Sequence, residues 1–349
     1  MLITIYIFEF VMPTQKANIV DIAKKAGVSI STVSRVLNGK AEEFRISEKS
    51  QQKVRETAKK LNYVPNQFAA SLKSGKSNTI ALLIPSLSNP FFADIASEIN
   101  AEVRNRGYIT IIGDSDENKE IENEELLQMQ SRNIEGLVIA PCDQNWKGIK
   151  KLHDQGLPVV CIDRYFENLD IPYVSTDNYE GAIMATKHLL ENGHQRIACI
   201  QGVPDSVPNK LRIKGYTDAM IGAGNKDYQI IGNEFSVQNG YKEMKLLLQQ
   251  RERPTAIFAL SNTIAIGCIK ALREENLSIP DHISLITFDD HPFLDYLATP
   301  LTCITQPTRE ICRIAIKYLF FMLTNKEIKQ SQVLLKPELK YRKSVKRIL

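Results

Sequence analysis

The pattern of apolar positions near the start of the chain predicts two short helices joined by a turn. One apolar face of the first helix, over residues 18–26, contains Ile19, Ile22, Ala23 and Ala26. Gly27 follows and ends the pattern, as glycine commonly does just past a helix. Two short helices joined by a glycine-containing turn form a helix-turn-helix.

The second helix has two faces of different chemistry. Ser29 is a good N-cap, and Val33, Val36 and Leu37 point inward. Its outward face holds Ile30, Ser31, Thr32, Ser34, Arg35 and Asn38. Most of these groups hydrogen-bond phosphates or base edges, whereas an ordinary surface helix prefers Glu and Lys there. The pattern therefore favours a DNA-reading helix over a plain amphipathic helix of a small bundle.

A third predicted helix completes this N-terminal part. Ser47 caps it, its inward face contains Val54, Ala58 and Leu61, and its outward face is rich in Lys and Arg. Pro65 stops it, and a short Ala-rich segment at 66–73 restarts the helical pattern.

Beyond residue 79 the apolar pattern alternates between strands and helices. The predicted strands are 80–85, 108–113, 136–140, 158–163, 196–201, 229–232, 256–260 and 283–288. The predicted helices are 91–106, 120–131, 181–191, 209–223, 240–250 and 263–275. Apolar strands that each precede an amphipathic helix imply parallel sheets covered on both faces. The strands are too many for one comfortable sheet, so we expect two doubly wound lobes, and the polar stretch 166–176 is a natural crossing between them.

Ordered motifs in the chain resemble those of the LacI/GalR family of transcriptional regulators. The matching text is DIAKKAGVSISTVSRVLNG and then LNYVPNQFAASLKSGKSNTIALLIP, and similar patterns continue almost to the C-terminus. The resemblance covers roughly residues 17–345. One departure is the loop at 39–45, GKAEEFR, which is about three residues longer than usual and leaves its phosphate contacts open.

The resemblance implies a small all-α helix-turn-helix head and an α/β two-lobed body like a periplasmic sugar-binding protein. The expected parts are an extension at 1–16 that is disordered or precedes the true start, a head at 17–64, a hinge helix and linker at 65–78, and a body at 79–349. In the body, lobe one takes about 79–174 and 306–335, and lobe two takes about 175–305 and 336–349.

By the same resemblance, the head contacts a double-stranded DNA operator in two ways. Ile30, Ser31 and Arg35 face base edges in the major groove, with Arg35 pairing with a guanine. Phosphate contacts are expected from Ser29, Thr32, Ser34 and Asn38. In the hinge, Leu72 is expected to wedge into the minor groove beside Ala69 and Lys73, with burial of Leu72 against its own head as the alternative.

Polar residues at the carboxyl ends of the body strands point to a ligand cleft between the lobes. By resemblance, the effector is held by Phe91, Phe92, Asp163, Arg164, Arg212 and Asp289. Rings and paired polar groups suit a sugar, a sugar acid or a sugar phosphate. Taken alone, Asp163 or Asp289 could be a helix N-cap, and Arg212 a surface salt bridge. Two departures, Ser261-Asn262 in place of Asn-Asp and an apolar Ala140 at a strand end, leave the effector's identity open.

Charge and cysteine content narrow the possible classes. Residues 12–76 carry 13 Lys and Arg against 5 acidic residues, whereas the rest of the chain carries 31 against 35. A basic head on a mildly acidic body is typical of a DNA-binding protein with a second function. The six cysteines are scattered singly in apolar runs, which indicates reduced core residues in a cytoplasmic protein and no zinc site.

Two rival classes fit the sequence less well. The Gly-Lys-Ser at 75–77 lacks the upstream glycine and preceding strand of a phosphate loop, so we expect no enzyme and no cofactor. An exported sugar receptor would not carry the basic head, and residues 1–11 lack the features of a signal peptide or membrane anchor. The expected protein is a dimeric, effector-responsive repressor of carbohydrate-utilisation genes that acts on DNA in the cytoplasm.

Overall fold

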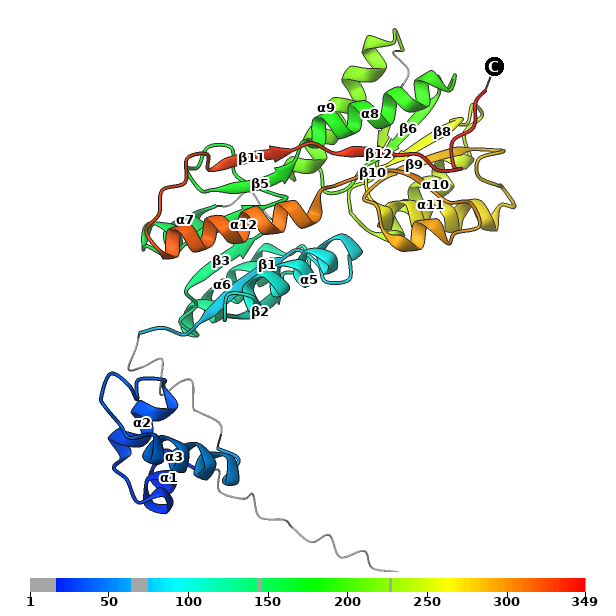
Figure 1. The fold of residues 1–349 in the computed structure, drawn as a ribbon. Helices are drawn as coiled ribbons and strands as arrows, with labels where there is room; N and C mark the ends of the chain where they lie inside the picture. Colours follow the sequence, from blue (N-terminus) through cyan, green and yellow to red (C-terminus); the bar gives the residue numbers. More distant parts are fainter. Residues whose placement is uncertain (1–16, 64–74, 143–145, 226–227, 349) are drawn as a thin grey trace, which may run out of the picture. The chain divides into compact units, whose positions relative to one another are not determined.

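The computed structural model describes residues 17–63, 75–142, 146–225 and 228–348 (Figure 1). The chain divides between Lys76 and Ser77 into two compact units, a helical head and a larger α/β body. The expected DNA contacts Ala69, Leu72 and Lys73 and the extension at 1–16 lie outside the described residues.

Three helices form the head: α1 (Ile19–Ala26), α2 (Ile30–Leu37) and α3 (Glu48–Lys60). Each begins at a side chain that accepts backbone N–H groups of the first turn, namely Asn18, Ser29 and Ser47. Gly27 follows α1 with φ of 65°, a left-handed conformation that costs glycine little. The head core contains Ile22, Ala23, Ala26, Val33, Val36, Ala41, Val54 and Ala58.

The first sheet of the body has the strand order β11-β5-β4-β3-β1-β2, and all its pairings are parallel. Its strands are β1 (Thr79–Ile84), β2 (Ile109–Asp114), β3 (Gly136–Ile139), β4 (Val159–Ile162), β5 (Tyr173–Thr176) and β11 (Gln332–Leu335). Helices α5 (Pro90–Arg104) and α12 (Thr308–Leu323) cover one face, and α6 (Lys119–Ser131) and α7 (Lys147–Asp154) cover the other. This sheet and its helices form lobe one.

The second sheet has the order β12-β10-β9-β8-β6-β7 and forms lobe two. Its strands are β6 (Ile197–Ile200), β7 (Gln229–Ile231), β8 (Ala256–Ala259), β9 (Ser284–Phe288), β10 (Thr302–Thr305) and β12 (Glu338–Lys340). Only β12 runs antiparallel to its neighbour. Helices α8 (Asn178–Glu191) and α9 (Val207–Gly222) cover one face of this sheet. Helices α10 (Val237–Leu248) and α11 (Asn262–Glu274) cover the other face. A short 3-10 helix, η1 (Pro292–Asp295), follows β9.

These two sheets, one parallel and one parallel except for β12, are each covered on both faces and confirm the predicted fold class. The chain passes between the sheets after β5, between β10 and α12, and between β11 and β12. The stretch 166–176 is only partly a crossing, because its last four residues are β5 and pair with both β4 and β11. The strand pattern also missed β10, β11 and β12, which are only three or four residues long, and the helical pattern missed α7 and α12.

Helices α10 and α11 approach so closely that two glycines face the opposite backbone. A Cβ at Gly240 would lie 2.1 Å from the carbonyl oxygen of Ile264, and one at Gly267 would lie 2.1 Å from that of Val237. Gly240→Ala should therefore lower the free energy of unfolding of the body by at least about 1–3 kcal/mol, because the helices must separate. Urea unfolding of the full chain measures the change.

Gly222, the last residue of α9, provides the matched control. A Cβ there meets nothing within 4 Å, and its φ is not in the left-handed region. Gly222→Ala should be neutral or stabilising by up to about 1 kcal/mol, since alanine has the higher helix propensity. A Gly240→Ala protein that unfolds at the same urea concentration as wild type would show that the two helices can move apart freely.

Candidate functional site

The outward face of α2 presents the residues expected to meet DNA. Ile30 is 48% exposed, and Ser29, Ser31, Arg35 and Asn38 are exposed as well. The hydroxyl of Ser29 is 2.8 Å from those of Ser31 and Thr32, and the Asn38 amide donates to Ser34 Oγ at 3.3 Å. The polar groups therefore form two small hydrogen-bonded clusters, one at the start of the helix and one at its end.

The described part of the head is also strongly basic. Residues 17–63 hold ten Lys and Arg against five acidic residues, and all ten basic side chains are exposed. No salt bridge forms among these residues. A positive surface of this kind favours contact with a polyanion such as nucleic acid, and the hydroxyl and amide groups on α2 are of the type that can hydrogen-bond phosphates or base edges.

In the body, all six residues expected to hold an effector line one small cavity. Phe91, Phe92, Asp163 and Arg164 come from lobe one, and Arg212 and Asp289 come from lobe two. Four further residues complete the lining: Asn89, Pro208, Phe235 and Ser261. The cavity volume is about 20 Å³, room for about one water molecule, so the lobes are closed around these side chains.

The two phenylalanines lie in the first turn of α5. Asn89 caps this helix by accepting the N–H of Phe91 at 3.1 Å, and Pro90 occupies its first position. The rings of Phe91 and Phe92 meet edge to face with centroids 5.1 Å apart, and both are at least 92% buried. They therefore give the cavity a rigid aromatic wall.

Asp163 directly follows β4 and is 4% exposed. Its φ of 58° is left-handed, an uncommon conformation for an aspartate that turns the chain sharply at the strand end. One carboxylate oxygen, Oδ1, is buried and has no hydrogen-bond partner. Burial raises its pKa to about 6, although Arg212 and Arg164 oppose the shift. An unpartnered buried acceptor at a cavity indicates a place for a donor from a ligand.

Arg164 is held in place by the carboxylate of Glu117. Its Nη1 and Nη2 donate to the two oxygens of Glu117 at 2.7 and 2.6 Å, a bidentate pair with the arginine 3% exposed. The guanidinium also lies 5.8 Å from the ring centroids of Phe92 and Phe235. Its charge is therefore largely compensated before any ligand arrives.

Arg212 enters the cavity from the second turn of α9 and is 3% exposed. Its Nε donates to Asn178 Oδ1 at 2.8 Å, and its Nη1 donates to the carbonyl of Leu260 at 2.7 Å. The guanidinium carbon is 3.7 Å from the centroid of the Phe288 ring. Burial lowers the pKa of Arg212, while Asp289 and Asp163 oppose that shift.

Asp289 repeats in lobe two the geometry of Asp163. It directly follows β9, has φ of 71° and is 4% exposed. It accepts a hydrogen bond of 2.6 Å from Gln306, whose oxygen accepts one of 2.5 Å from Thr176. Burial raises the pKa of Asp289, and Arg212 and Gln306 oppose the shift. Thr176 and Gln306 stand at two points where the chain leaves one sheet for the other, so this network joins the lobes.

The alternative roles considered for three of these residues are wrong. Asp163 and Asp289 cap no described helix: His291 caps the helix after β9, and Asp177 caps α8. Arg212 is not a surface residue, since it is buried among Asn178, Leu260 and Phe288.

Sequence reasoning missed part of the cavity. Asn89 and Ser261 line the cavity but were not among the predicted site residues, although Asn89 lies two positions before the predicted helix 91–106 and Ser261 follows the predicted strand 256–260. Gln306 does not line the cavity but donates to Asp289, which does. It follows directly after β10, so the expectation of polar residues at strand ends would have identified it if that short strand had been predicted. Pro208 and Phe235 carry no such signal in the sequence.

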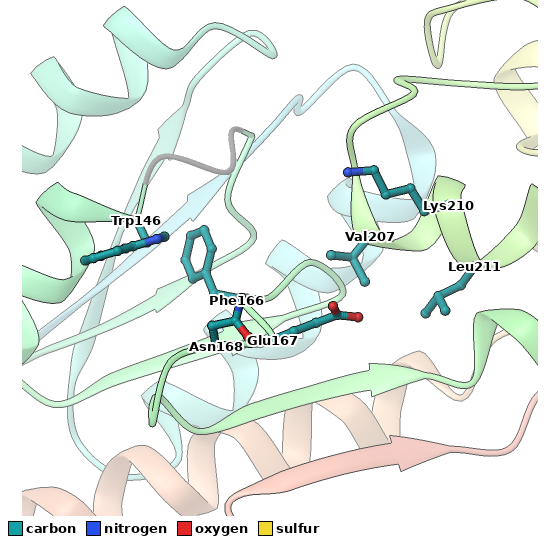
Figure 2. Close-up of a pocket in the computed structure, with 7 residues that line it drawn as sticks. All are labelled: Trp146, Phe166, Glu167, Asn168, Val207, Lys210 and Leu211. Atoms are coloured by element: carbon teal, nitrogen blue, oxygen red, sulfur yellow. The ribbon is translucent and has the colours of Figure 1, made fainter.

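A second cavity, of about 180 Å³, adjoins the same helix α9 (Figure 2). Trp146 and the segment Phe166, Glu167 and Asn168 line it from lobe one, and Val207, Lys210 and Leu211 line it from α9. It is larger than the first cavity and combines two rings with one acidic and one basic side chain.

Other chemistry is sparse in the part of the chain that the structure describes. No group of three or more His, Cys, Asp or Glu there could hold a metal ion. All six cysteines are free thiols, five of them buried. No described helix is both long enough and apolar enough to cross a membrane.

Known proteins match the chain in both units. The profile described as bacterial regulatory proteins, lacI family, matches residues 18–66, and that of a periplasmic binding protein-like domain matches residues 186–345. The ribose operon repressor of Escherichia coli (strain K12) is 32% identical over 333 residues, which are 94% of this chain and 99% of that protein.

Solved structures share the fold. The lac repressor dimer bound to operator and the anti-inducer ONPF aligns with a TM-score of 0.83 at 24% identity, covering 95% of this chain and 100% of that one. A LacI family transcriptional regulator from Enterococcus faecium, solved with bound ribose, aligns with a TM-score of 0.71 at 27% identity over 78% of this chain and 100% of that one.

Proposed function

Because the chain belongs to the lacI family of bacterial regulatory proteins, we propose that it is an effector-responsive repressor of carbohydrate-utilisation genes. It binds a pseudo-palindromic operator as a dimer through the α2 face of the head, and a small sugar-like effector occupies the cavity between the lobes. Its relatives are transcriptional regulators, not enzymes.

One observation carries the effector part of this proposal. Six residues at strand ends and in the helices that follow, contributed by both lobes, line one small cavity beside the unpartnered carboxylate oxygen of Asp163. Sites of this kind, with aromatic walls and a few converging polar groups, are typical of small-ligand binding. The cleft location is where ligands bind in open parallel α/β sheets.

Charge in the cavity favours a neutral sugar over a sugar acid or phosphate. Two arginines, Arg164 and Arg212, face three carboxylates when Asp163, Asp289 and the supporting Glu117 are ionised. Arg164 is committed to Glu117, and two of the guanidinium nitrogens of Arg212 already donate to the protein. The free acceptor on Asp163 can accept a hydrogen bond from a donor such as a sugar hydroxyl. A small neutral polyol fits this set, and ribose, named for two similar proteins, is the first candidate.

Effector and DNA binding are coupled through the lobes. A ligand that touches both lobes stabilises the arrangement in which they close on it, which is wider than the empty cavity of about 20 Å³. It shifts the equilibrium only by its differential affinity for the two states. Lobe one continues through residues 75–78 toward the hinge, so this change in the lobe arrangement alters the spacing of the two hinges in the dimer. A coupling of about 1–3 kcal/mol is enough for a working switch. We propose that Leu72, flanked by Ala69 and Lys73, is the hinge group that responds by entering the minor groove.

Selection of duplexes from a randomised pool by the full chain tests the DNA part. The proposal expects enrichment of a two-fold symmetric sequence with half-sites about one or two helical turns apart. Titrating the selected duplex complex with ribose, ribonate and ribose 5-phosphate then tests the effector part. Ribose alone should change the operator affinity; a change caused only by the anionic compounds would reject the neutral-sugar assignment.

Effector affinity should fall as the pH falls through about 6. The pKa of Asp163 is raised to about 6 in the free protein, and a hydroxyl donor from the effector favours its charged form, so binding releases a proton below that pH. The affinity should weaken about tenfold between pH 7 and pH 5. Calorimetric titrations at a series of pH values measure it.

Asp163→Asn is the matched control for this pH dependence. The asparagine side chain has the same size but cannot titrate. The part of the pH dependence of effector affinity that Asp163 causes between pH 5 and pH 7 should therefore disappear. An Asp163→Asn protein with the full wild-type pH dependence would place the titrating group elsewhere.

A further inference from the structure

The long loop after α2 places an aromatic ring on the arginine expected to read DNA. The guanidinium carbon of Arg35 lies 3.8 Å from the ring centroid of Phe44, the distance of a close cation–π contact. Phe44 is 41% exposed, and Arg35 is exposed. No described carboxylate forms a salt bridge with Arg35, although Glu42 and Glu43 belong to the same loop.

The loop that carries Phe44 is anchored at both ends. Lys40 N–H donates to the Arg35 carbonyl at 2.9 Å, and Ile46 N–H donates to the Ala41 carbonyl at 2.9 Å. The side chain of Ala41 is 2% exposed and belongs to the head core. The ring is therefore presented by a fixed turn that starts from the same helix end as Arg35.

Stacking of this kind leaves the arginine able to read a base. The contact engages the guanidinium through its carbon, 3.8 Å from the ring centroid, whereas the N–H donors of a guanidinium lie in its plane and point outward along its edge. That edge is the part that pairs with O6 and N7 of a guanine. Holding a long side chain in one orientation before binding also reduces the conformational entropy lost when the contact forms.

We propose that Phe44 is a specificity-determining residue of the DNA interface, because its ring orients the Arg35 guanidinium for contact with a guanine. The inference rests on the proposed function, since it assumes that Arg35 reads a base. It also gives a role to the extra length of the loop at 39–45, which brings Phe44 back over α2.

The test uses the full chain and the best duplex selected by the wild-type protein, together with duplexes in which single G·C pairs are replaced by A·T symmetrically in the half-sites. Phe44→Ala, Phe44→Leu and Phe44→Tyr are each made in the wild-type and Arg35→Ala backgrounds. Fluorescence anisotropy gives the affinities. Binding to poly(dI-dC) and the thermal midpoint of the head are measured alongside.

Phe44→Ala should weaken binding about threefold per half-site, the size of an exposed cation–π contact, and only for duplexes that keep the guanine read by Arg35. Phe44→Leu should match Phe44→Ala, because leucine fills space without a π face, and Phe44→Tyr should restore the wild-type preference. In the Arg35→Ala background Phe44→Ala should have no further effect. Binding to poly(dI-dC) should not change.

Three results would overturn the inference. An equal loss from Phe44→Ala in the Arg35→Ala background would mean that Phe44 acts independently of Arg35. A Phe44→Leu protein with the wild-type sequence preference would show that Phe44 acts only as an apolar side chain and that its π face is not needed. A loss that is equal on every duplex and on poly(dI-dC) would make Phe44 a structural residue or a backbone contact. If the wild-type protein selects no sequence at all, the proposed function itself fails, which is a separate outcome.

Discussion

Replacing Arg212 with Ala is expected to abolish the response to effector while leaving operator binding intact. The substitution removes the donors to Asn178 and to the Leu260 carbonyl and the cation over Phe288, and it leaves Asp163 and Asp289 without their shared counter-charge. Truncating one partner of a buried charged group of this kind costs about 2–5 kcal/mol of binding free energy, or about 30-fold to several thousand-fold in affinity. Calorimetry with ribose and anisotropy with the selected operator measure the two functions separately.

Arg273, an exposed arginine on α11, is the matched control for this experiment. Arg273→Ala removes the same side chain from the same lobe and should change neither function. Asp289→Ala should reproduce the loss, because Arg212 and Gln306 then lose their common partner. If Arg212→Ala still responds at the wild-type ribose concentration, Arg212 does not belong to the effector site.

Replacing Arg35 with Ala is expected to have a comparably large effect at the DNA. A guanine contact is worth about 1–3 kcal/mol, and a dimer on a symmetric operator loses it in both half-sites, so the total is about 2–6 kcal/mol. Preference should relax at one base pair of each half-site and stay unchanged elsewhere. Repeating the selection from the randomised pool with Arg35→Ala, and measuring affinities for the symmetric base-pair variants, gives both quantities.

Lys24, an exposed lysine of α1, is a useful comparison because it faces solvent and lies outside the α2 surface. If it contacts phosphate, Lys24→Ala should weaken binding evenly across sequences and reduce the salt dependence by about one counterion. If Arg35→Ala instead lowers the affinity equally for all DNA sequences, Arg35 contacts phosphate and does not recognise a base.

The sequence predicted the architecture because its signals are local. The alternation of apolar strands and amphipathic helices was enough for two doubly wound lobes, and Gly27 and Ser29 marked the turn in the head. Asp163 and Asp289 were predicted because they are polar residues at the carboxyl ends of strands and because the family resemblance places ligand contacts there. Neither signal predicts the left-handed backbone of these residues or the unpartnered oxygen of Asp163, because those follow from how the chain packs around them.

Contacts between distant segments were the part that the sequence could not supply. The pairing of Arg164 with Glu117 joins a strand end to the loop before α6, across 47 residues. Gln306 and Thr176 are 130 residues apart and meet only because both lie where the chain changes lobes. Phe44 stacks on Arg35 through the conformation of one loop, for which no periodic pattern exists.

The small volume of the closed cavity also determines how fast an effector can act. A space of about 20 Å³ admits no sugar, so the ligand enters only while the lobes are apart. The association rate should therefore level off at high ligand concentration, at the rate of lobe opening, and domain motions occur on the microsecond to millisecond scale. The apparent affinity should also equal the intrinsic affinity multiplied by the fraction of molecules that are open, so a small open fraction lowers it. A substitution that holds the lobes together would thus weaken and slow sensing without touching any ligand contact.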